Sequence, residues 1–244
     1  MILPFKGYLL PPQHPSLVAH GAADQLFGPN STLPSDGTAV GYVHDLSGYN
    51  NHAVQSGSAR PTFKTNIQNG LPGILFDAVS SQYLNIAHTE SLDITGSVLL
   101  YVVCKGVDDS AIFCGPYKDV DTGNAPYGFG TQRQGQFSNG PDTATPGAGG
   151  STAGISTIIE IHFDGNEDGF YYRSTGETGT DTLIGGGPLK SNTRPVRVGA
   201  QKVANMRFFD GHIFEWMIYA SDTTAEFRTK VREYLSAKWD ITLA

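Results

Sequence analysis

Cysteine is scarce in this sequence. Cys104 and Cys114 are the two cysteines among its 244 residues. That number is too small for a disulfide framework, and the spacing is not that of a zinc site. The two thiols either face each other across a hairpin and form one bridge or lie unlinked in the core, and the sequence leaves both alternatives open. A chain of this length buries roughly 70–75 % of its unfolded surface, so its core needs no covalent staple.

Charged residues are also few. They make up 16 % of the chain, against ~25 % in typical domains. With 16 basic and 23 acidic residues, the formal net charge is −7. No stretch is basic, so the release of counterions from phosphates, which drives nucleic-acid binding, has little to act on. We therefore expect no nucleic-acid partner.

Long apolar runs are absent. The longest, Val98–Cys104, is far shorter than the ~20 residues that a membrane-spanning helix needs. Residues 1–10 are largely apolar, but prolines and a lysine interrupt them, and they lack the basic start and small-residue cleavage site of a signal peptide. We expect no membrane span, and an extended arm over residues 1–14 before one domain over residues 15–244. The alternative is a tail that packs on its own domain.

Glycine, in contrast, is abundant, and it separates short segments with a period of two. The 30 glycines exceed the usual share of ~7 %. Ile159, Ile161 and Phe163 fall on one side of a predicted strand, and Glu160 and His162 fall on the other. The turn residues DGNEDG then predict a hairpin. Similar β-rich segments occur at 73–77, 83–86, 98–104, 111–114, 127–131, 194–198 and 212–219. This pattern is typical of a β-sandwich or jelly roll.

Two segments depart from the pattern. Residues 140–154 carry no large apolar side chain and predict a surface loop. Near the C-terminus, Thr223 and Glu226 have the spacing of a capping box at a helix N-terminus. Apolar residues then recur at i, i+4, i+7, i+8 and i+12, as one stripe of a helix: Phe227, Val231, Tyr234, Leu235 and Trp239. We expect this helix to pack its stripe against the sandwich.

Three stretches carry a resemblance to a known family. They are HDLSGYNNHA at 44–53, NGLPGILFDAVSSQYLNI at 69–86 and the segment 207–241, which begins RFFDGHIFEWMIY. In this order they resemble the concanavalin A-like, laminin-G-like jelly-roll domains of the lectin and glucanase superfamily, over Pro15–Ile241. The resemblance implies an all-β sandwich of two antiparallel sheets with one C-terminal α-helix. This fold hosts lectins, glycosidases, lyases and adhesion modules, so it does not fix the function.

Calcium is common in such relatives, but this chain departs from their pattern. Val43 stands where many members have tryptophan, and Ala78 follows Asp77 where glycine is usual. Ser80 and Ser81 are neutral where many members have an acidic pair. Because calcium needs several oxygen ligands, preferably carboxylates, we expect no cofactor. Asp77 is the one remaining candidate for a calcium ligand.

Most catalytic motifs are missing. The sequence has no Glu-x-Asp-x-x-Glu strand of a glucanase, no nucleophile elbow, no P-loop, no dinucleotide fingerprint and no H-E-x-x-H. Acid–base chemistry would depend on Glu160, His162 and Asp164 on the polar face of one strand, with Glu215 on a neighbouring strand. These residues would suit a glycoside hydrolase or a polysaccharide lyase. Alternation alone also places polar residues on the wetter face of a strand.

The polar turn in the first motif offers little to a metal. His44, Asp45 and His52 fit no common ligand spacing. Asn50 and Asn51 predict turn chemistry, in which side-chain amides bond the local backbone.

Carbohydrate binding is easier to support. Sugars are held by aromatic rings against their C–H faces and by polar side chains that bond their hydroxyls. The chain has 11 tyrosines and 13 phenylalanines. The candidates outside the expected core, with the polar residues that flank them, are Tyr117, Tyr127, Tyr171, Tyr172, Asp119, Asp121, Asn124 and Gln132. The alternative for each tyrosine is that it covers a sheet edge.

We interpret the sequence as a non-enzymatic, lectin-like module that binds a glycan or polysaccharide. The expected setting is a virion or extracellular one: a phage head-decoration, head-fibre or tail-fibre component anchored to neighbouring subunits through residues 1–14. Such components are commonly symmetric homo-oligomers, and a trimer is the first expectation. The alternatives are a glycoside hydrolase or polysaccharide lyase that acts on an extracellular polysaccharide, and a structural subunit without a ligand.

Overall fold

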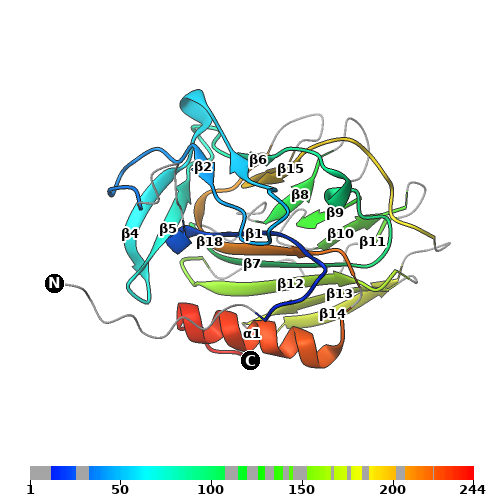
Figure 1. Ribbon diagram of the computed structural model, residues 1–244. Coiled ribbons are helices and arrows are strands. Elements are labelled where there is room, and N and C mark those ends of the chain that lie inside the picture. The colour runs from blue at the N-terminus through cyan, green and yellow to red at the C-terminus, as the bar shows by residue number, and fades with distance from the viewer. Residues whose placement is uncertain are drawn as a thin grey trace.

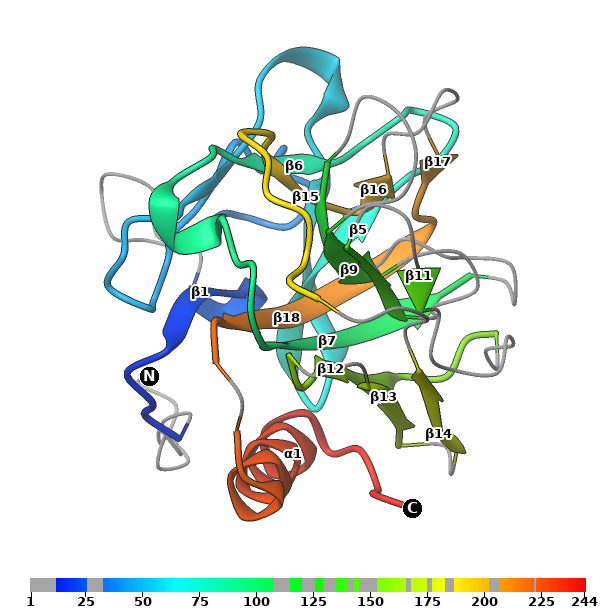
Figure 2. The same cartoon turned by 90° about the vertical axis from the view of Figure 1, so that its right-hand side faces the viewer.

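The molecule has three layers, two β-sheets and one helix (Figure 1). Figure 2 shows the helix, α1 (Ala225–Trp239), below one sheet, on the side away from the other sheet. This arrangement confirms the predicted all-β sandwich with a C-terminal α-helix. The computed structural model describes residues 12–25, 33–107, 115–119, 126–129, 135–139, 143–144, 153–165, 168–174, 177–182, 187–201, 207–221 and 223–244.

The sheet next to α1, the helix-side sheet, is antiparallel. Its order is β14 (Glu177–Thr182), β13 (Asp168–Arg173), β12 (Thr157–Phe163), β7 (Val98–Gly106), β18 (Gly211–Tyr219), β5 (Leu71–Phe76) and β4 (Thr62–Gln68). The first strand, β1 (Leu17–Ala22), pairs with the second half of β18. Gly21 lies opposite Trp216 in this pairing, and a side chain at Gly21 would collide with the indole ring.

The opposite sheet, the outer sheet, is made of shorter antiparallel strands. Its order is β11 (Thr143–Ala144), β10 (Gly135–Ser138), β9 (Tyr127–Phe129), β8 (Pro116–Lys118), β15 (Val196–Val198), β6 (Leu84–Ile86), β3 (Ala53–Val54) and β2 (Tyr42–Val43). A small ribbon pairs β16 (Ala200–Gln201) with β17 (Arg207–Phe208). Three short 3-10 helices complete the elements of the described residues: η1 (Ala23–Gln25), η2 (Gly57–Ala59) and η3 (Glu90–Leu92).

Two hydrophobic cores follow from the alternation of side chains along the strands. On β18, Trp216 and Ile218 face the core between the sheets, whereas Met217 and Tyr219 face α1. A bulge between Ile213 and Glu215 shifts this alternation by one residue. The central strands β12, β7 and β18 are therefore buried on both faces.

Helix α1 confirms the predicted stripe, because Val231, Tyr234, Leu235 and Trp239 are buried against the sheet. The predicted cap is wrong by one residue. The N-cap is Thr224, whose hydroxyl accepts the Phe227 N–H at 3.2 Å. Glu226 therefore falls at the second helical position instead of the third, so it closes no capping box, and its carboxylate pairs with Lys230 at 2.7 Å.

The predicted strands largely match the structure. The segments 73–77, 83–86, 98–104, 194–198 and 212–219 contain β5, β6, β7, β15 and β18, and the hairpin after Phe163 is β12–β13. Segment 127–131 begins with β9, and 111–114 lies outside the described residues. The predicted loop at 140–154 is interrupted by β11, which pairs with β10. None of the helices described has the length and apolar character needed to cross a bilayer.

The described part of the N-terminal arm contacts the domain. The His14 ring lies 4.7 Å from the Phe227 ring of α1, between centroids. Residues 1–11 and Cys114 lie outside the described residues, and Cys104 is buried between the sheets. The last residue of the predicted arm, His14, therefore contacts α1.

Candidate functional site

The acid–base candidates lie beneath α1. Glu215 on β18 is fully buried and accepts hydrogen bonds from Tyr234 Oη at 3.0 Å and Trp239 Nε1 at 2.7 Å. His20 Nε2 on β1 lies 2.7 Å from the same carboxylate, and Lys238 Nζ lies 3.0 Å from it. One carboxylate thus joins β18, β1 and α1. We call these five residues the Glu215 cluster.

Electrostatics holds the Glu215 carboxylate ionised. Burial alone would raise its pKa, but the ammonium of Lys238 and the hydrogen bond from His20 outweigh burial and lower the pKa to about 2. Lys238 Nζ also lies 2.9 Å from Oδ1 of Asp24. Burial disfavours the charge of Lys238, yet Glu215 and Asp24 together raise its pKa. The Glu215 cluster is therefore a buried ion pair with a second carboxylate beside it.

Glu160 occupies a second buried cluster on the same face. Its Oε2 lies 3.2 Å from Arg232 Nη1, and its Oε1 lies 3.5 Å from Arg228 Nε. The Arg232 guanidinium sits 4.5 Å above the Tyr172 ring. Burial raises the pKa of Glu160, and the two arginines and the Tyr101 hydroxyl oppose that rise. We call these five residues the Glu160 cluster.

The expectation that Glu160 and His162 lie on a wet strand face is therefore wrong. Glu160 and Glu215 are 0 % exposed and His162 is 5 % exposed, because α1 covers the sheet face that carries both carboxylates. Glu215 is also not on a strand next to β12, since β7 lies between β12 and β18. In the structure, both carboxylates contact side chains of α1, and neither is exposed to solvent.

Two of the predicted binding residues come together on the outer sheet. Arg197 lies between Val196 and Val198, which face the core, so its side chain lies on the opposite face of the sheet. Arg197 pairs in register with Tyr117 and donates to Asp119 Oδ2 at 3.1 Å. Tyr117 and Asp119 are only 0 % and 2 % exposed. They lie outside both hydrophobic cores, as expected, but they are packed away from solvent.

The other aromatic candidates are scattered. Tyr127 points into the core and donates to the Leu92 carbonyl at 2.7 Å, so its ring is not outside the core as expected. Tyr172 is 7 % exposed in the Glu160 cluster. The backbone of Tyr171 lies in β13, and its side chain is not described. Asp121, Asn124 and Gln132 lie outside the described residues.

The Asp77 carboxylate accepts hydrogen bonds within its own turn. Its Oδ1 accepts the Val79 N–H at 2.9 Å and its Oδ2 accepts the Ser80 hydroxyl at 2.5 Å. These bonds, that of Ser80 first, lower the pKa of Asp77. The described residues include no group of three or more His, Cys, Asp or Glu side chains that could hold a metal ion. The residues around Asp77 therefore do not fit a calcium ion in this arrangement.

The HDLSGYNNHA motif folds around Asp45. The Asp45 carboxylate accepts hydrogen bonds from His20 N at 2.9 Å, Asn51 N at 2.9 Å, and both N and Oγ of Ser47 at 3.0 and 2.7 Å. Asn50 has a φ of 60°, as expected for a turn. We call residues 45–51 the Asp45 loop. One buried carboxylate organises it and fixes it to β1.

Asn51 behaves differently from its prediction. Its Nδ2 donates to the Val18 carbonyl at 2.6 Å and to Ser91 Oγ at 2.9 Å, so it ties the loop to distant segments instead of to its own turn. His52 Nδ1 accepts the Asp45 N–H at 3.0 Å. The neutral His52 ring then carries its proton on Nε2, which disfavours metal ligation there although His44 lies beside it.

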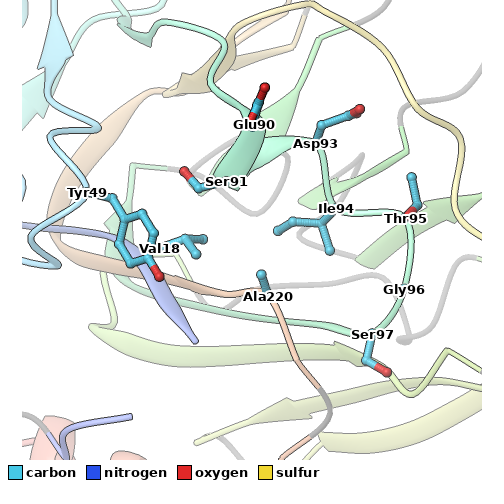
Figure 3. A pocket seen from close by; sticks show the side chains of 10 residues that line it. All are labelled: Val18, Tyr49, Glu90, Ser91, Asp93, Ile94, Thr95, Gly96, Ser97 and Ala220. Carbon is cyan, nitrogen blue, oxygen red and sulfur yellow. The ribbon is translucent and has the colours of Figure 1, made fainter. Parts of the chain in front are cut away.

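An open pocket lies next to the Asp45 loop, at the rim of the sandwich (Figure 3). Its volume is about 320 Å³. Tyr49 and Ser91 stand on one side, and the apolar side chains of Val18, Ile94 and Ala220 point into its centre. The ten residues that line it are Val18, Tyr49, Glu90, Ser91, Asp93, Ile94, Thr95, Gly96, Ser97 and Ala220. We call it the rim pocket.

Tyr49 is the residue that sequence reasoning missed. It is 49 % exposed, and its hydroxyl lies 3.5 Å from the Pro15 carbonyl. The available signal was an aromatic ring in the middle of the polar turn SGYNNHA, where nothing requires an apolar side chain. The rim pocket thus combines an accessible ring, an apolar floor and hydroxyl groups.

Comparison with known proteins identifies the fold. No protein-family model and no curated protein matches the sequence. Among solved structures, a GH54 α-L-arabinofuranosidase is similar at a TM-score of 0.61 and 12 % identity, over 93 % of this chain and 64 % of that chain. The binding domain of Paraclostridial Mosquitocidal Protein 1 is similar at 0.58 and 9 %, over 91 % and 52 %.

The binding domain of botulinum neurotoxin DC, solved with SialylT, is similar at a TM-score of 0.58 and 10 % identity, over 90 % of this chain and 52 % of that chain. This chain thus spans between about half and two thirds of the length of these structures. Likeness at such low identity establishes the β-sandwich fold that carbohydrate-binding and glycosidase proteins share.

Proposed function

We propose that this protein is a carbohydrate-binding β-sandwich module that works without catalysis. The observation that carries the proposal is the rim pocket, in which the accessible Tyr49 ring stands beside an apolar floor and hydroxyl groups. Sugars offer C–H faces to aromatic rings and hydroxyls to polar side chains. The structural neighbours that are glycosidases or toxin binding domains agree with this class of ligand.

The burial of the acid–base candidates supports the non-catalytic part of the proposal. A general acid or base must reach the proton that it transfers, within about 3 Å or through one water. Glu160 and Glu215 are instead enclosed beneath α1, and their oxygens are engaged by arginine, lysine, histidine, tyrosine and tryptophan side chains.

The binding test compares wild-type protein with Tyr49→Ala on a glycan array and by calorimetry. Loss of the ring should weaken glycan binding about tenfold or more, in line with the ~0.5–1.5 kcal/mol of an aromatic contact plus its buried area. Val79→Ala is the matched control, because Val79 is 92 % exposed and lies outside the pocket. Equal binding by wild type and Tyr49→Ala would contradict the proposed site.

The catalytic alternative has its own test. Wild-type protein is incubated with the polysaccharides that it binds, and the products are separated by chromatography. Binding without product supports a lectin-like role. Product release that disappears in a folded Glu160→Gln variant would overturn it, whereas Glu226→Gln, at an exposed carboxylate of α1, is the control.

The setting that we propose is a virion or extracellular surface, with attachment to neighbouring subunits through the N-terminal arm and a trimeric assembly. Deletion of residues 1–11 tests it without removing His14, which packs on Phe227. The deletion should abolish attachment to the partner particle and leave glycan binding intact. Attachment by the truncated protein would contradict the anchoring role, and light scattering that reports a monomer would contradict the trimer.

A further inference from the structure

We infer that the rim pocket takes neutral sugars and discriminates against sugars that carry a carboxylate, such as uronic and sialic acids. The inference rests on the proposed function and adds the class of ligand. Its basis is the charge of the lining: the ten residues include the carboxylates of Glu90 and Asp93 and no lysine, arginine or histidine. Among the described residues that line the pocket, a carboxylate on a sugar would therefore meet two like charges and no cationic side chain.

The two carboxylates place this repulsion along one edge of the pocket. Figure 3 shows Glu90 and Asp93 along one edge, with their carboxylates directed away from the apolar centre. Glu90 is exposed. Repulsion from this edge acts on a sugar carboxylate that approaches the pocket as well as on one that is bound.

The charge of Asp93 is held in place by neutral donors. Ser191 Oγ donates to its Oδ2 at 2.6 Å, and the Asn192 N–H donates to its Oδ1 at 3.1 Å. These bonds orient the carboxylate without cancelling its charge. The lysine that interacts with Asp93, Lys118, is fully buried, has its Nζ 3.1 Å from His88 Nδ1 and does not line the pocket. Lys118 is therefore out of reach of a sugar carboxylate.

The remaining lining suits a neutral sugar ring. Val18, Ile94 and Ala220 offer an apolar floor to the C–H groups. Ser91 Oγ accepts a bond from Asn51 Nδ2 and donates its proton to Thr89 Oγ1, because the Thr89 hydroxyl itself donates to Asn51 Oδ1. It therefore offers a ligand its remaining acceptor position. A volume of about 320 Å³ is at the lower end of ligand pockets, so it fits a terminal sugar residue better than a long polysaccharide segment.

The experiment uses matched pairs of ligands: methyl glucoside with methyl glucuronide, and methyl galactoside with methyl galacturonide. Binding of the full chain is measured by calorimetry or ligand-observed NMR at low and high ionic strength. The neutral member of the pair that binds should do so about tenfold more tightly, which equals about 1.4 kcal/mol. High salt should reduce the difference in affinity between the neutral sugar and the uronide, because surface charges are screened over a Debye length of about 10 Å at 0.1 M.

Charge-removing variants sharpen the test. Glu90→Gln with Asp93→Asn keeps the shape of the lining and should narrow the difference in affinity between the uronide and the neutral sugar severalfold. Glu226→Gln removes an exposed charge on α1, away from the pocket, and should leave that difference unchanged.

A uronide that binds as well as its neutral partner, or a gap that the double variant leaves unchanged, overturns the inference. If that binding still depends on Tyr49, the proposed function stands. If no sugar of any kind binds, the proposed function and the inference that rests on it fall together.

Discussion

The face of the helix-side sheet beneath α1 and the rim pocket contain similar side chains, and they differ in what covers them. Both hold carboxylates, a tyrosine and further hydrogen-bonding groups. Beneath α1 the carboxylates of Glu160 and Glu215 are 0 % exposed and paired with cations. At the pocket Tyr49 is 49 % exposed, and Asp93 is held by neutral donors. Residue type therefore does not separate the structural clusters from the proposed binding site, whereas coverage and charge pairing do.

The largest effect on stability is expected from removal of the central carboxylate beneath α1. Glu215→Ala removes the carboxylate that His20, Tyr234 and Trp239 bond, and it leaves Lys238 paired with Asp24 alone. We expect a loss of roughly 3–5 kcal/mol in the free energy of unfolding, measured by urea denaturation. Lys230→Ala is the control, since its pair with Glu226 is exposed and should add nothing measurable. A loss no larger than that of the control would show that the Glu215 cluster does not hold α1.

Removing Asp45 extends the comparison to the pocket side. Asp45→Ala leaves the buried N–H groups of His20 and Asn51 without their acceptor, so we expect a loss of roughly 2–4 kcal/mol in the free energy of unfolding. Glycan affinity should fall with it, because the Asp45 loop carries Tyr49. Asp36→Ala, at an exposed carboxylate that bonds Thr65, should cost much less and leave affinity unchanged. Unchanged affinity in Asp45→Ala would separate the loop from the site.

Acid should affect the two carboxylates beneath α1 in opposite directions. The pKa of Glu215 falls from its ordinary 4.5 to about 2 on folding, so its contribution to stability is present above pH 4.5 and is lost as the pH falls toward 2. The pKa of Glu160 is raised on folding, so protonation in mild acid favours the folded state there.

Urea unfolding as a function of pH should therefore give a flatter acid limb for Glu215→Gln than for the wild type. Glu160→Gln should give a steeper limb, because it removes the group whose protonation offsets the loss. Parallel profiles for all three proteins would contradict the assignment.

The helix cap offers the smallest change. Thr224→Ala removes the acceptor of the Phe227 N–H and should cost about 1 kcal/mol. Thr223 is 4 % exposed, and within the described residues its hydroxyl has no hydrogen-bond partner. Thr223→Val should thus be neutral or stabilising, when the stability of both variants is measured by thermal unfolding. The reverse order of the two variants would favour the capping box expected from the sequence.

Local pattern was enough to predict most of the fold. Alternation at Ile159, Ile161 and Phe163 identifies a strand and the face that enters the core, and the stripe ending at Trp239 identifies the helix. These signals depend on residues that are close in the sequence, so they can be recognised from the sequence alone. The position of the cap failed by one residue, because Thr223 and Thr224 are both good caps and tertiary packing decides between them.

The site could not be predicted in the same way. Alternation shows that Glu160 opposes Ile159 on its strand, but not that a helix more than sixty positions later covers that face. Tyr117 and Tyr127 differ only in which face of the outer sheet they occupy, which depends on where the core lies. The rim pocket is assembled from β1, the Asp45 loop, η3, the segment 93–97 that follows it and Ala220 after β18, so no single stretch of sequence carries its signature.

The pairing of β1 with β18 also sets the order of events during folding. Within the described residues β1 pairs with no strand other than β18, and the contact between His20 and Glu215 joins positions 195 residues apart. Contacts between residues so far apart in the sequence raise the contact order, and a high contact order slows folding. The chain must close a long loop before these contacts can stabilise it. During synthesis, β1 could pair only after β18 has left the ribosome. The rim pocket contains residues from both ends of the domain, so it would form last.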